Sequence, residues 1–292
     1  MKLCYYHDTE GNFGDDLNAW LWPRLLPGII DGTCQVGEEY KEQNNGEKAL
    51  LYGIGTILDD RIPPAPVKFI AGSGCGYFDA PKIDNSYNIY FVRGPNTAAQ
   101  IGIDKELGIG DPAILLKQLI PRPEKTIHKI SLIMHCDTAK SGYWKSIAED
   151  LGIHHIDPRS SDPMTVVHAL INSEYIITES LHGAIIADAF DIPWLPISTM
   201  PHINPFKWDD WCKTVRLTYQ PEKLISIYED HQANSLKKIV NSGKAKIARR
   251  QLKKLLAEQR SFNSAPQTID SLCSQMTEKL ELLKTDAQRL AD

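Results

Sequence analysis

Several features are scarce in this chain of 292 residues, and each absence excludes a class of protein. No apolar run approaches the roughly 18 residues that a membrane-spanning helix needs, and the first residues lack a signal-peptide core. The six cysteines are scattered without a Cys-x-x-Cys pair, so neither a zinc ribbon nor a disulfide framework is indicated. The net charge of -5 gives no reason to expect a nucleic-acid partner. We therefore expect a cytoplasmic protein.

A complete dinucleotide fingerprint is also missing. Residues 53–55 and 72–76 are rich in glycine, but neither segment has the third spaced glycine and the downstream acid. Binding of NAD is therefore not favoured. Cys75 lies in the second segment, and because spacing assigns no base to it, we interpret it as a buried small side chain rather than a nucleophile.

What the chain does contain is an alternation of strand-like and helical runs. The hydrophobic content of 42% and charged content of 24% are those of an ordinary globular protein. The alternation is typical of parallel sheets with crossover helices. The predicted strands are residues 2–6, 49–54, 67–71, 88–92, 107–109, 129–135, 153–156 and 175–178, and the predicted helices are residues 17–26, 96–102, 141–151, 164–171 and 184–190.

A proline-interrupted, charged stretch at residues 120–125 reads as a linker. Together with the alternation of strands and helices, this linker predicts an α/β protein with two Rossmann-like domains facing across a cleft. The domains are residues 1–120 and 121–220, and a helical tail follows at residues 221–292. A cleft between domains is a common place for a site that binds two substrates.

The tail has a different character. Residues 236–260 carry nine basic side chains against the single acid Glu258, with apolar residues at helical spacing. One interpretation is a basic amphipathic helix that touches the inner face of an anionic membrane. The favoured alternative is a solvated face whose apolar stripe packs on the body of the protein. The basic residues are Lys237, Lys238, Lys244, Lys246, Arg249, Arg250, Lys253, Lys254 and Arg260.

The most informative segment is the turn Ser180-Leu181-His182-Gly183. It follows a β-branched and aromatic run and precedes an alanine-rich helical run, so it lies at the carboxyl end of a strand and the amino end of a helix. Free N–H groups and the helix dipole favour a phosphate or carboxylate there. The alternative is a capped helix in which Ser180 or His182 only satisfies backbone donors.

This turn resembles that of the polysaccharide pyruvyl transferases. Further segments support the resemblance in the expected order, over roughly residues 1–212. They are Asn12-Phe13-Gly14-Asp15, Val92-Arg93-Gly94-Pro95, Gly110-Asp111-Pro112-Ala113, Met134-His135 and Lys207-Trp208-Asp209-Asp210-Trp211. The resemblance implies a GT-B-like fold with the acceptor on the first domain and the donor on the second. It also implies transfer of the enolpyruvyl group of phosphoenolpyruvate to a sugar of a polysaccharide or its lipid-linked precursor, which forms a pyruvate ketal and releases phosphate. No cofactor is implied.

Such a reaction needs neutralisation of the donor's charges, a proton for its methylene carbon and a base for the attacking hydroxyl. Arg93 follows an apolar run and can grip a carboxylate or phosphate, or pair with a surface acid. His182 can donate the proton or share the phosphate, and His135 is a second acid or phosphate ligand, or a structural histidine.

Three acids leave alternatives open. Asp15 is a candidate base, although the simplest account is that Asp15 or Asp16 caps the following helix. Asp111 is likewise either a cap or a cleft acid. Glu179 stands where this family more often has Ser or Thr, and an extra carboxylate there weakens anion binding unless it faces away or bonds an arginine.

The aromatic-acidic segment at residues 207–211 can offer ring faces and carboxylates to a sugar, or its tryptophans can close a core. The predicted catalytic residues are His182, Asp15 and His135, and the predicted substrate-binding residues are Arg93, Ser180, Gly183, Asn12, Asp111, Trp208 and Asp209; no metal ligand is predicted. The alternatives are a GT-B-type glycosyltransferase that uses a nucleotide sugar, and a non-catalytic partner in a polysaccharide assembly complex.

Overall fold

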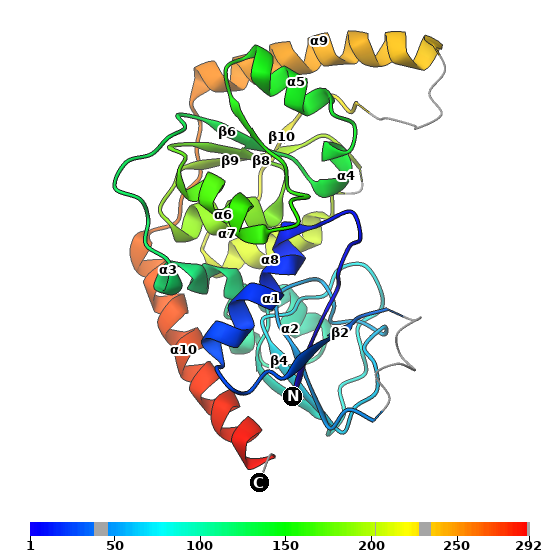
Figure 1. Ribbon diagram of the computed structural model, residues 1–292, viewed down its shortest axis with the longest axis vertical. Helices are drawn as coiled ribbons and strands as arrows, with labels where there is room; N and C mark the ends of the chain where they lie inside the picture. Colours follow the sequence, from blue (N-terminus) through cyan, green and yellow to red (C-terminus); the bar gives the residue numbers. More distant parts are fainter. Residues whose placement is uncertain (38–45, 202, 228–234, 291–292) are drawn as a thin grey trace.

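Two parallel sheets form the frame of the protein. The computed structural model describes residues 1–37, 46–201, 203–227 and 235–290, with the backbone alone at residues 235–238. Both sheets have five strands, and every strand pair in them is parallel. One sheet lies below the other in Figure 1, with helices around both. The prediction of an α/β fold built on parallel sheets is confirmed.

The first sheet and its helices form what we call the N-terminal unit. Its strand order is β2-β1-β3-β4-β5, and the central strand β3 is an apolar run with all four residues buried. The strands are β1 (Lys2–Tyr5), β2 (Gly32–Gln35), β3 (Ala49–Tyr52), β4 (Val67–Ala71) and β5 (Tyr87–Phe91), and the helices are α1 (Phe13–Leu25), α2 (Pro95–Gln100), η2 (Lys105–Leu107), η3 (Pro112–Leu115) and α3 (Leu116–Leu119).

Two predictions for this unit are wrong. Residues 107–109 do not form a strand, because Leu107 is the last residue of the short 3₁₀ helix η2, which the Asp104 side chain caps. Neither Asp15 nor Asp16 caps α1, since the helix begins at Phe13 and Asn12 occupies the N-cap position. Both acids therefore lie within the first turn of α1.

The second sheet and its helices form the C-terminal unit. The strand order is β10-β9-β8-β6-β7. The strands are β6 (Ser131–Ile133), β7 (His154–Ile156), β8 (Ile176–Thr178), β9 (Trp194–Ser198) and β10 (Glu222–Lys223), and the helices are α4 (Cys136–Ala139), α5 (Tyr143–Asp150), α6 (Pro163–Ile171), α7 (Leu181–Ala189) and α8 (Pro205–Thr214). The sequence did not predict β2, β9, β10 or α8.

Helices join the two units. Helix α1 packs against α6, α2 against α8, and η3 against α7. One continuous core cluster includes Leu17 and Trp22 of the N-terminal unit and Ile185 and Trp208 of the C-terminal unit. This shared core fixes the facing ends of the two sheets, where the candidate site lies.

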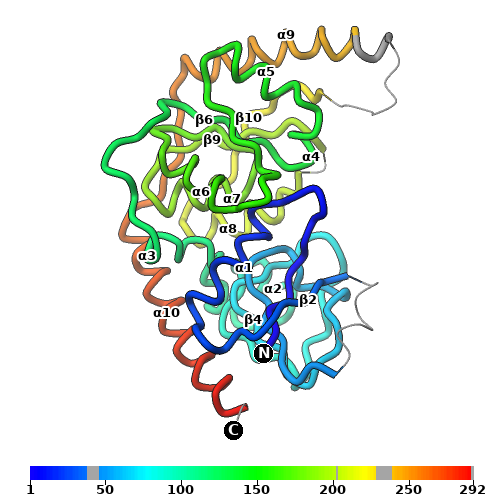
Figure 2. The backbone as a smooth tube through the Cα atoms, viewed as in Figure 1, coloured from blue at the N-terminus to red at the C-terminus, as the bar shows by residue number. Residues whose placement is uncertain are grey.

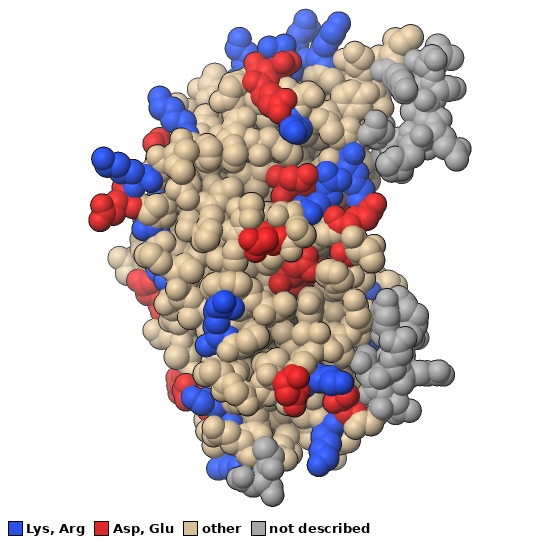
Figure 3. Space-filling view, in the orientation of Figure 1, with Lys and Arg blue, Asp and Glu red and all other residues tan. Residues whose placement is uncertain are grey.

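Two long helices follow the second sheet. Helix α9 (Ser235–Glu258) packs on α5 and buries Ala248 and Leu252. Helix α10 (Pro266–Arg289) runs beside both units in Figure 2 and contacts β5, η3 and α7. Lysine and arginine side chains gather along the upper edge of the molecule over α9 (Figure 3). The side chains of residues 236–238, which the sequence analysis included in the basic stretch, lie outside the described residues. Within the described chain, no helix is long and apolar enough to cross a membrane.

Candidate active site

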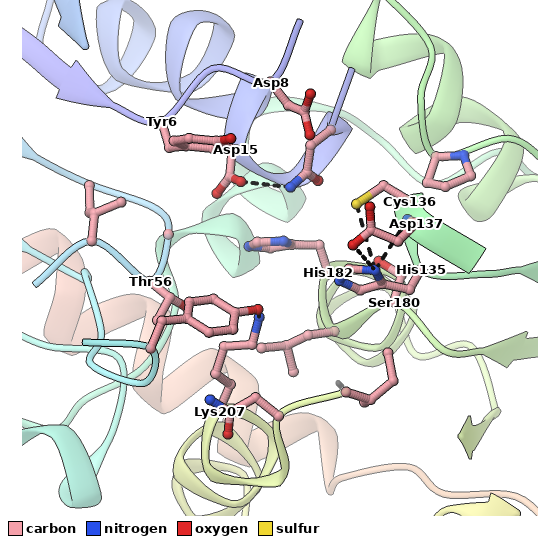
Figure 4. A pocket seen from close by; sticks show the side chains of 18 of the residues that line it. Tyr6, Asp8, Asp15, Thr56, His135, Cys136, Asp137, Ser180, His182 and Lys207 are labelled. Atoms are coloured by element: carbon pink, nitrogen blue, oxygen red, sulfur yellow. Dashed lines mark hydrogen bonds and ion pairs between the residues drawn. The ribbon is translucent and has the colours of Figure 1, made fainter. Parts of the chain in front are cut away.

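A cavity of about 480 Å³ is lined by residues of both units. The carboxyl ends of parallel strands and the first turns of the following helices supply its polar side chains, as expected for this kind of sheet. Figure 4 shows Asp15, His182 and Lys207 entering one space from three different elements. The predicted site residues that line the cavity are Asn12, Asp15, Arg93, Asp111, His135, Ser180, His182 and Trp208.

The turn that opens α7 is both a helix cap and a wall of the cavity. The Ser180 hydroxyl caps the helix by accepting from the Gly183 N–H at 3.3 Å. The N–H groups of Leu181 and His182 precede the first complete turn, so no helical carbonyl can accept from them. The helix dipole and these N–H donors favour the binding of an anion at the N-terminus of α7.

Gly183 is needed for packing rather than for contact with a ligand. It does not line the cavity. A Cβ at this position would lie 2.6 Å from Thr178 Oγ1 and 2.9 Å from Ile133 Cγ2. The absence of a side chain thus lets α7 approach the second sheet closely.

The ring of His182 is held between the two units. Its Nε2 atom is buried and has no hydrogen-bond partner among the described residues, and it lies 3.6 Å from Asp111 Oδ2. On the other side, a Cβ on Gly14 would lie 1.9 Å from His182 Nδ1. Because buried polar atoms are normally satisfied, an unpartnered Nε2 in a cavity wall indicates a ligand contact.

Asp111 combines the two roles that the sequence left open. Its Oδ1 accepts from the Ala113 N–H at 2.9 Å and so caps η3. Its Oδ2 faces His182 across the boundary between the units. The carboxylate therefore caps a helix and also orients the histidine.

Asp15 and Lys207 carry opposite charges and line the same cavity. Burial raises the pKa of Asp15 to about 6, against the opposing influence of His182 and Lys207. Burial and the nearby Arg93 charge lower the pKa of Lys207 to about 8. The Asn12 amide donates to Asp15 Oδ2 at 2.6 Å. A carboxyl group that titrates near neutral pH is suited to accept a proton during catalysis.

Lys207 is a site residue that sequence reasoning missed. It lies in the first turns of α8, and its ammonium group contacts the Tyr77 hydroxyl. The segment at residues 207–211 drew attention for its aromatic and acidic residues, but spacing along the chain does not reveal which face of α8 meets the cavity. The helical period, which places residues 207, 208 and 211 on one face, was the available signal.

Arg93 is a buried partner of Asp210 as well as part of the cavity wall. Its Nε donates to Asp210 Oδ2 at 3.1 Å, Nη1 to Thr56 Oγ1 at 2.8 Å and Nη2 to the Cys75 carbonyl at 2.6 Å. The sequence left open an anion ligand or a surface ion pair. The ion pair is buried rather than on the surface and ties the chain after β5 to α8, and Arg93 still lines the cavity.

Glu179 is engaged on its own side of the turn. It accepts from the Thr199 N–H and hydroxyl, each at 2.6 Å, and from the His135 N–H at 3.3 Å. These bonds join the ends of β6, β8 and β9. The partners are thus a threonine and a backbone N–H rather than the arginine that the sequence analysis named as one condition for anion binding, and the residue lines the cavity.

His135 caps α4 and is followed by Cys136 and Asp137, two residues whose side chains can bind metal ions. Its Nδ1 accepts from the Asp137 N–H at 3.3 Å. The ligand atoms of His135, Cys136 and Asp137 lie within 4.8 Å of one another, which makes this turn the candidate metal-holding group among the described residues. Burial raises the pKa of the Cys136 thiol to about 12, so the thiolate that binds metals is disfavoured.

The aromatic-acidic segment mainly builds the core. Trp208 is buried and stacks on Tyr219 with ring centroids 4.8 Å apart, and Trp211 packs against Trp194. Asp209 does not line the cavity; it pairs with Lys213 at 2.7 Å. The sequence left open whether these tryptophans bind a sugar or close a core, and their packing is that of core residues.

The fold and the charged cavity define an α/β protein with a candidate transferase site at the junction of two parallel sheets. Comparison with known proteins is more specific. The family model "Polysaccharide pyruvyl transferase" matches residues 73–199. The succinoglycan biosynthesis protein ExoV of Rhizobium meliloti (strain 1021) is 42% identical over 231 residues, which are 77% of this chain and 68% of that protein. The chain belongs to the polysaccharide pyruvyl transferase family and is a transferase.

Solved structures give weaker matches. One structure of the wall teichoic acid polymerase TagF covers 100% of this chain and 90% of its own, with 8% identity and a TM-score of 0.43. Another covers 97% and 89%, with 7% identity and a TM-score of 0.37.

Proposed function

We propose that this protein transfers the pyruvyl group of phosphoenolpyruvate to two hydroxyls of a saccharide, forming a ketal. The observation that carries the proposal is the buried, unpartnered Nε2 of His182 at the start of α7, in the turn through which the chain resembles its family. A small dianion fits this position, because helix donors, Lys207 and Arg93 supply positive charge around it.

The reaction balances without a cofactor or an oxidant. The methylene carbon of phosphoenolpyruvate gains a proton and becomes a methyl group, and two saccharide oxygens bond to the neighbouring carbon. The C–O bond to phosphate breaks, and inorganic phosphate leaves. One hydroxyl proton ends on the methyl group and the other on the phosphate.

We assign the residues to these steps by their placement. Lys207, Arg93 and the N-terminus of α7 hold the phosphate and carboxylate of the donor. His182 delivers the proton to the methylene carbon, and Asp111 orients its ring. Asp15 accepts the proton of the attacking hydroxyl, a role that its pKa near 6 supports. His135, Asn12 and Ser180 line the same cavity and contact the substrates.

The family and the two parallel sheets support a GT-B-like arrangement in which the donor binds the C-terminal unit and the acceptor the N-terminal unit. The relative ExoV is named for succinoglycan biosynthesis, which supports an exopolysaccharide, or its lipid-linked precursor, as acceptor. We further propose that the basic outer face of α9 contacts an anionic membrane surface. Lys246, Arg250 and Lys253 are exposed there together with Ile239 and Ile247.

Ligand-induced melting shifts test the donor. A ligand present at a hundredfold excess over its Kd stabilises the folded state by about 2.7 kcal/mol. We expect phosphoenolpyruvate to raise the melting temperature of the wild type, and Lys207→Gln to reduce that shift, while the exposed control Lys82→Gln retains it. Stabilisation by uridine diphosphate and none by phosphoenolpyruvate would support a nucleotide-sugar glycosyltransferase instead.

A further inference from the structure

Exposed aromatic rings gather at the cavity and beside it. Among the described residues, Tyr6, Tyr77 and Phe78 are the most exposed tyrosine, phenylalanine and tryptophan side chains, with exposed fractions of 39%, 51% and 51%. Tyr6 and Tyr77 line the cavity. Arg61 also lines it, and its guanidinium carbon stands 4.2 Å from the centroid of the Phe78 ring. Exposed rings gathered at one cavity mark a binding surface.

Two of these rings, Tyr77 and Phe78, belong to one segment whose backbone is held in place. Hydrogen bonds from the surrounding chain fix residues 73–76 on one side of the two rings and Asp79 on the other. The bonds run from Ser73 Oγ to the Gly53 carbonyl, from the Gly74 N–H to the Gly55 carbonyl, from the Cys75 N–H to Thr97 Oγ1, from Asn204 Nδ2 to the Gly76 carbonyl and from the Asp60 N–H to the Asp79 carbonyl. A ring that is already held in place in water loses little conformational entropy when a ligand covers it, so its burial contributes more to the binding free energy.

Cations already contact two of these rings. The Arg61 guanidinium beside Phe78 donates to both carboxylate oxygens of Asp59, at 2.9 Å and 2.7 Å, and the Lys207 ammonium lies 4.4 Å from the centroid of the Tyr77 ring. Both rings still keep half of their surface exposed. The rim therefore offers partly open ring faces and hydrogen-bonding groups, with the carboxylates of Asp8 and Asp15 beside Tyr6. A neutral, hydroxyl-rich ligand with an apolar C–H face matches this combination, whereas a phosphate does not.

The rim also leads directly to the proposed base. Tyr6 lies next to Asp15 at the end of β1 (Figure 4), and Tyr77 meets Lys207 through its hydroxyl. We infer that Tyr6, Tyr77 and Phe78 form the subsite that holds the pyranose rings of the acceptor saccharide, with the reacting sugar directed at Asp15. This inference rests on the proposed function. It assigns acceptor stacking to the N-terminal unit rather than to Trp208 and Asp209 of α8.

Direct saccharide binding tests the subsite independently of the donor. Glucose and galactose tetrasaccharides are added to the full-length protein without phosphoenolpyruvate, and contacts are read by saturation-transfer NMR. We expect ring C–H signals of a bound saccharide to be saturated in the wild type and in Phe78→Trp, and weakened in Phe78→Ala and Tyr6→Ala. Leu282→Ala, on α10 and with an exposed fraction of 52%, is the matched control and should bind as the wild type does.

Steady-state kinetics separate this inference from the proposed function. Phe78→Ala should raise the acceptor KM about threefold to tenfold with the KM for phosphoenolpyruvate unchanged. An unchanged acceptor KM in both Phe78→Ala and Tyr6→Ala overturns the subsite even if phosphate is released. A wild type that saturates no saccharide also overturns it. A protein that binds saccharides through the rim but does not bind phosphoenolpyruvate keeps the subsite and contradicts the donor.

Discussion

At the residue scale, the cavity brings together a carboxyl group and an ammonium group whose pKa values are shifted toward each other. Burial raises the pKa of Asp15 to about 6 and lowers that of Lys207 to about 8. The proposed chemistry needs an ionised Asp15 and a protonated Lys207. Both forms are present together only between about pH 6 and pH 8. Asp15, Lys207 and His182 line the same cavity, so one cavity offers both a cation for an anionic ligand and a carboxylate that can accept a proton.

The pH dependence of kcat/KM follows from these two groups. We expect it to rise as the pH increases through about 6, where Asp15 loses its proton, and to fall through about 8, where Lys207 loses its charge. Asp15→Asn should reduce kcat roughly 100-fold to 10,000-fold and remove the acidic limb. Lys207→Arg should remove the alkaline limb, because a guanidinium stays protonated.

The ionisation of the substrates is the same for wild type and variants, so differences between their profiles belong to the protein. Rate measurements from pH 5 to 9 are sufficient for this comparison. Acidic and alkaline limbs that persist unchanged in both variants would contradict the assignment of these two residues.

The same burial predicts a stability effect with a defined sign. The folded-state pKa of Asp15 lies above its ordinary value of 3.8, so the fold favours the protonated form. The stability it contributes is present below about pH 4 and is lost as the pH rises through about 6. Asp15→Asn should therefore be more stable than the wild type at pH 8, by roughly 1 to 3 kcal/mol, and nearly equal to it at pH 4.

Thermal or urea unfolding at the two pH values measures this difference. Asp60→Asn, at an exposed aspartate, is the control and should show the same stability relative to wild type at both. A destabilised Asp15→Asn at pH 8 would mean that the ionised carboxylate is favoured by the fold.

Sequence reasoning located the α7 turn well but not its partners. The strand, turn and helix around Ser180 and His182 are encoded within a few residues, so local patterns predict them. The Arg93–Asp210 pair joins residues 117 positions apart, and the unpredicted role of Lys207 depends on how α8 is rotated. Such contacts depend on tertiary packing, which no local pattern encodes.

At the element scale, the site depends on how closely α1 approaches α7. Gly14 in the first turn of α1 leaves room for the His182 ring, since a Cβ there would lie 1.9 Å from Nδ1. Gly14→Ala should displace the ring and lower kcat at least about tenfold, because small misplacements of a catalytic group are costly. The measurement is kcat with saturating substrates.

A glycine in another helix provides the control for this change. A Cβ on Gly243 in α9 would meet nothing within 4 Å, so Gly243→Ala should keep kcat and stabilise the protein by about 0.5 to 1 kcal/mol. Equal kcat in Gly14→Ala and wild type would show that the ring can move without consequence.

Each strand that the sequence failed to predict lacks a clear local signal. Strand β2 is only half-buried, and β9 contains Pro196, which disfavours a strand interior. Strand β10 has only two residues. Strand β3, which was predicted, is by contrast a continuous apolar run with all four residues buried.

At the scale of the whole molecule, α10 packs against both units, whereas α9 lies at one end of the molecule. Helix α10 places Met276 and Leu283 in the shared core, packs on α7 of the C-terminal unit and bonds to the N-terminal unit, for example through Lys117 with Asp270 at 2.7 Å. Helix α9 lies at the end of the molecule away from the N-terminal unit (Figure 1). The sequence predicted a helical tail, but not which surfaces its two helices cover.

The basic face of α9 predicts binding to anionic vesicles. Co-sedimentation with phosphatidylglycerol vesicles should exceed that with phosphatidylcholine vesicles and should weaken with added salt. Lys246→Gln combined with Lys253→Gln should reduce the partition coefficient by at least about tenfold, at about 1 kcal/mol per charge. The same change of charge at the exposed Lys82 and Lys105 of the N-terminal unit is the control. Equal losses in both double variants would indicate a non-specific effect of net charge.

The chemical identity of the product tests the central claim most directly. The full-length protein is incubated with phosphoenolpyruvate and a saccharide that binds it, and the saccharide is examined by proton NMR while phosphate is measured. The account predicts one methyl singlet from a pyruvate ketal for each phosphate released, with both absent in His182→Ala. Phosphate release without a new methyl group on the saccharide, or undiminished ketal formation in His182→Ala, would contradict it.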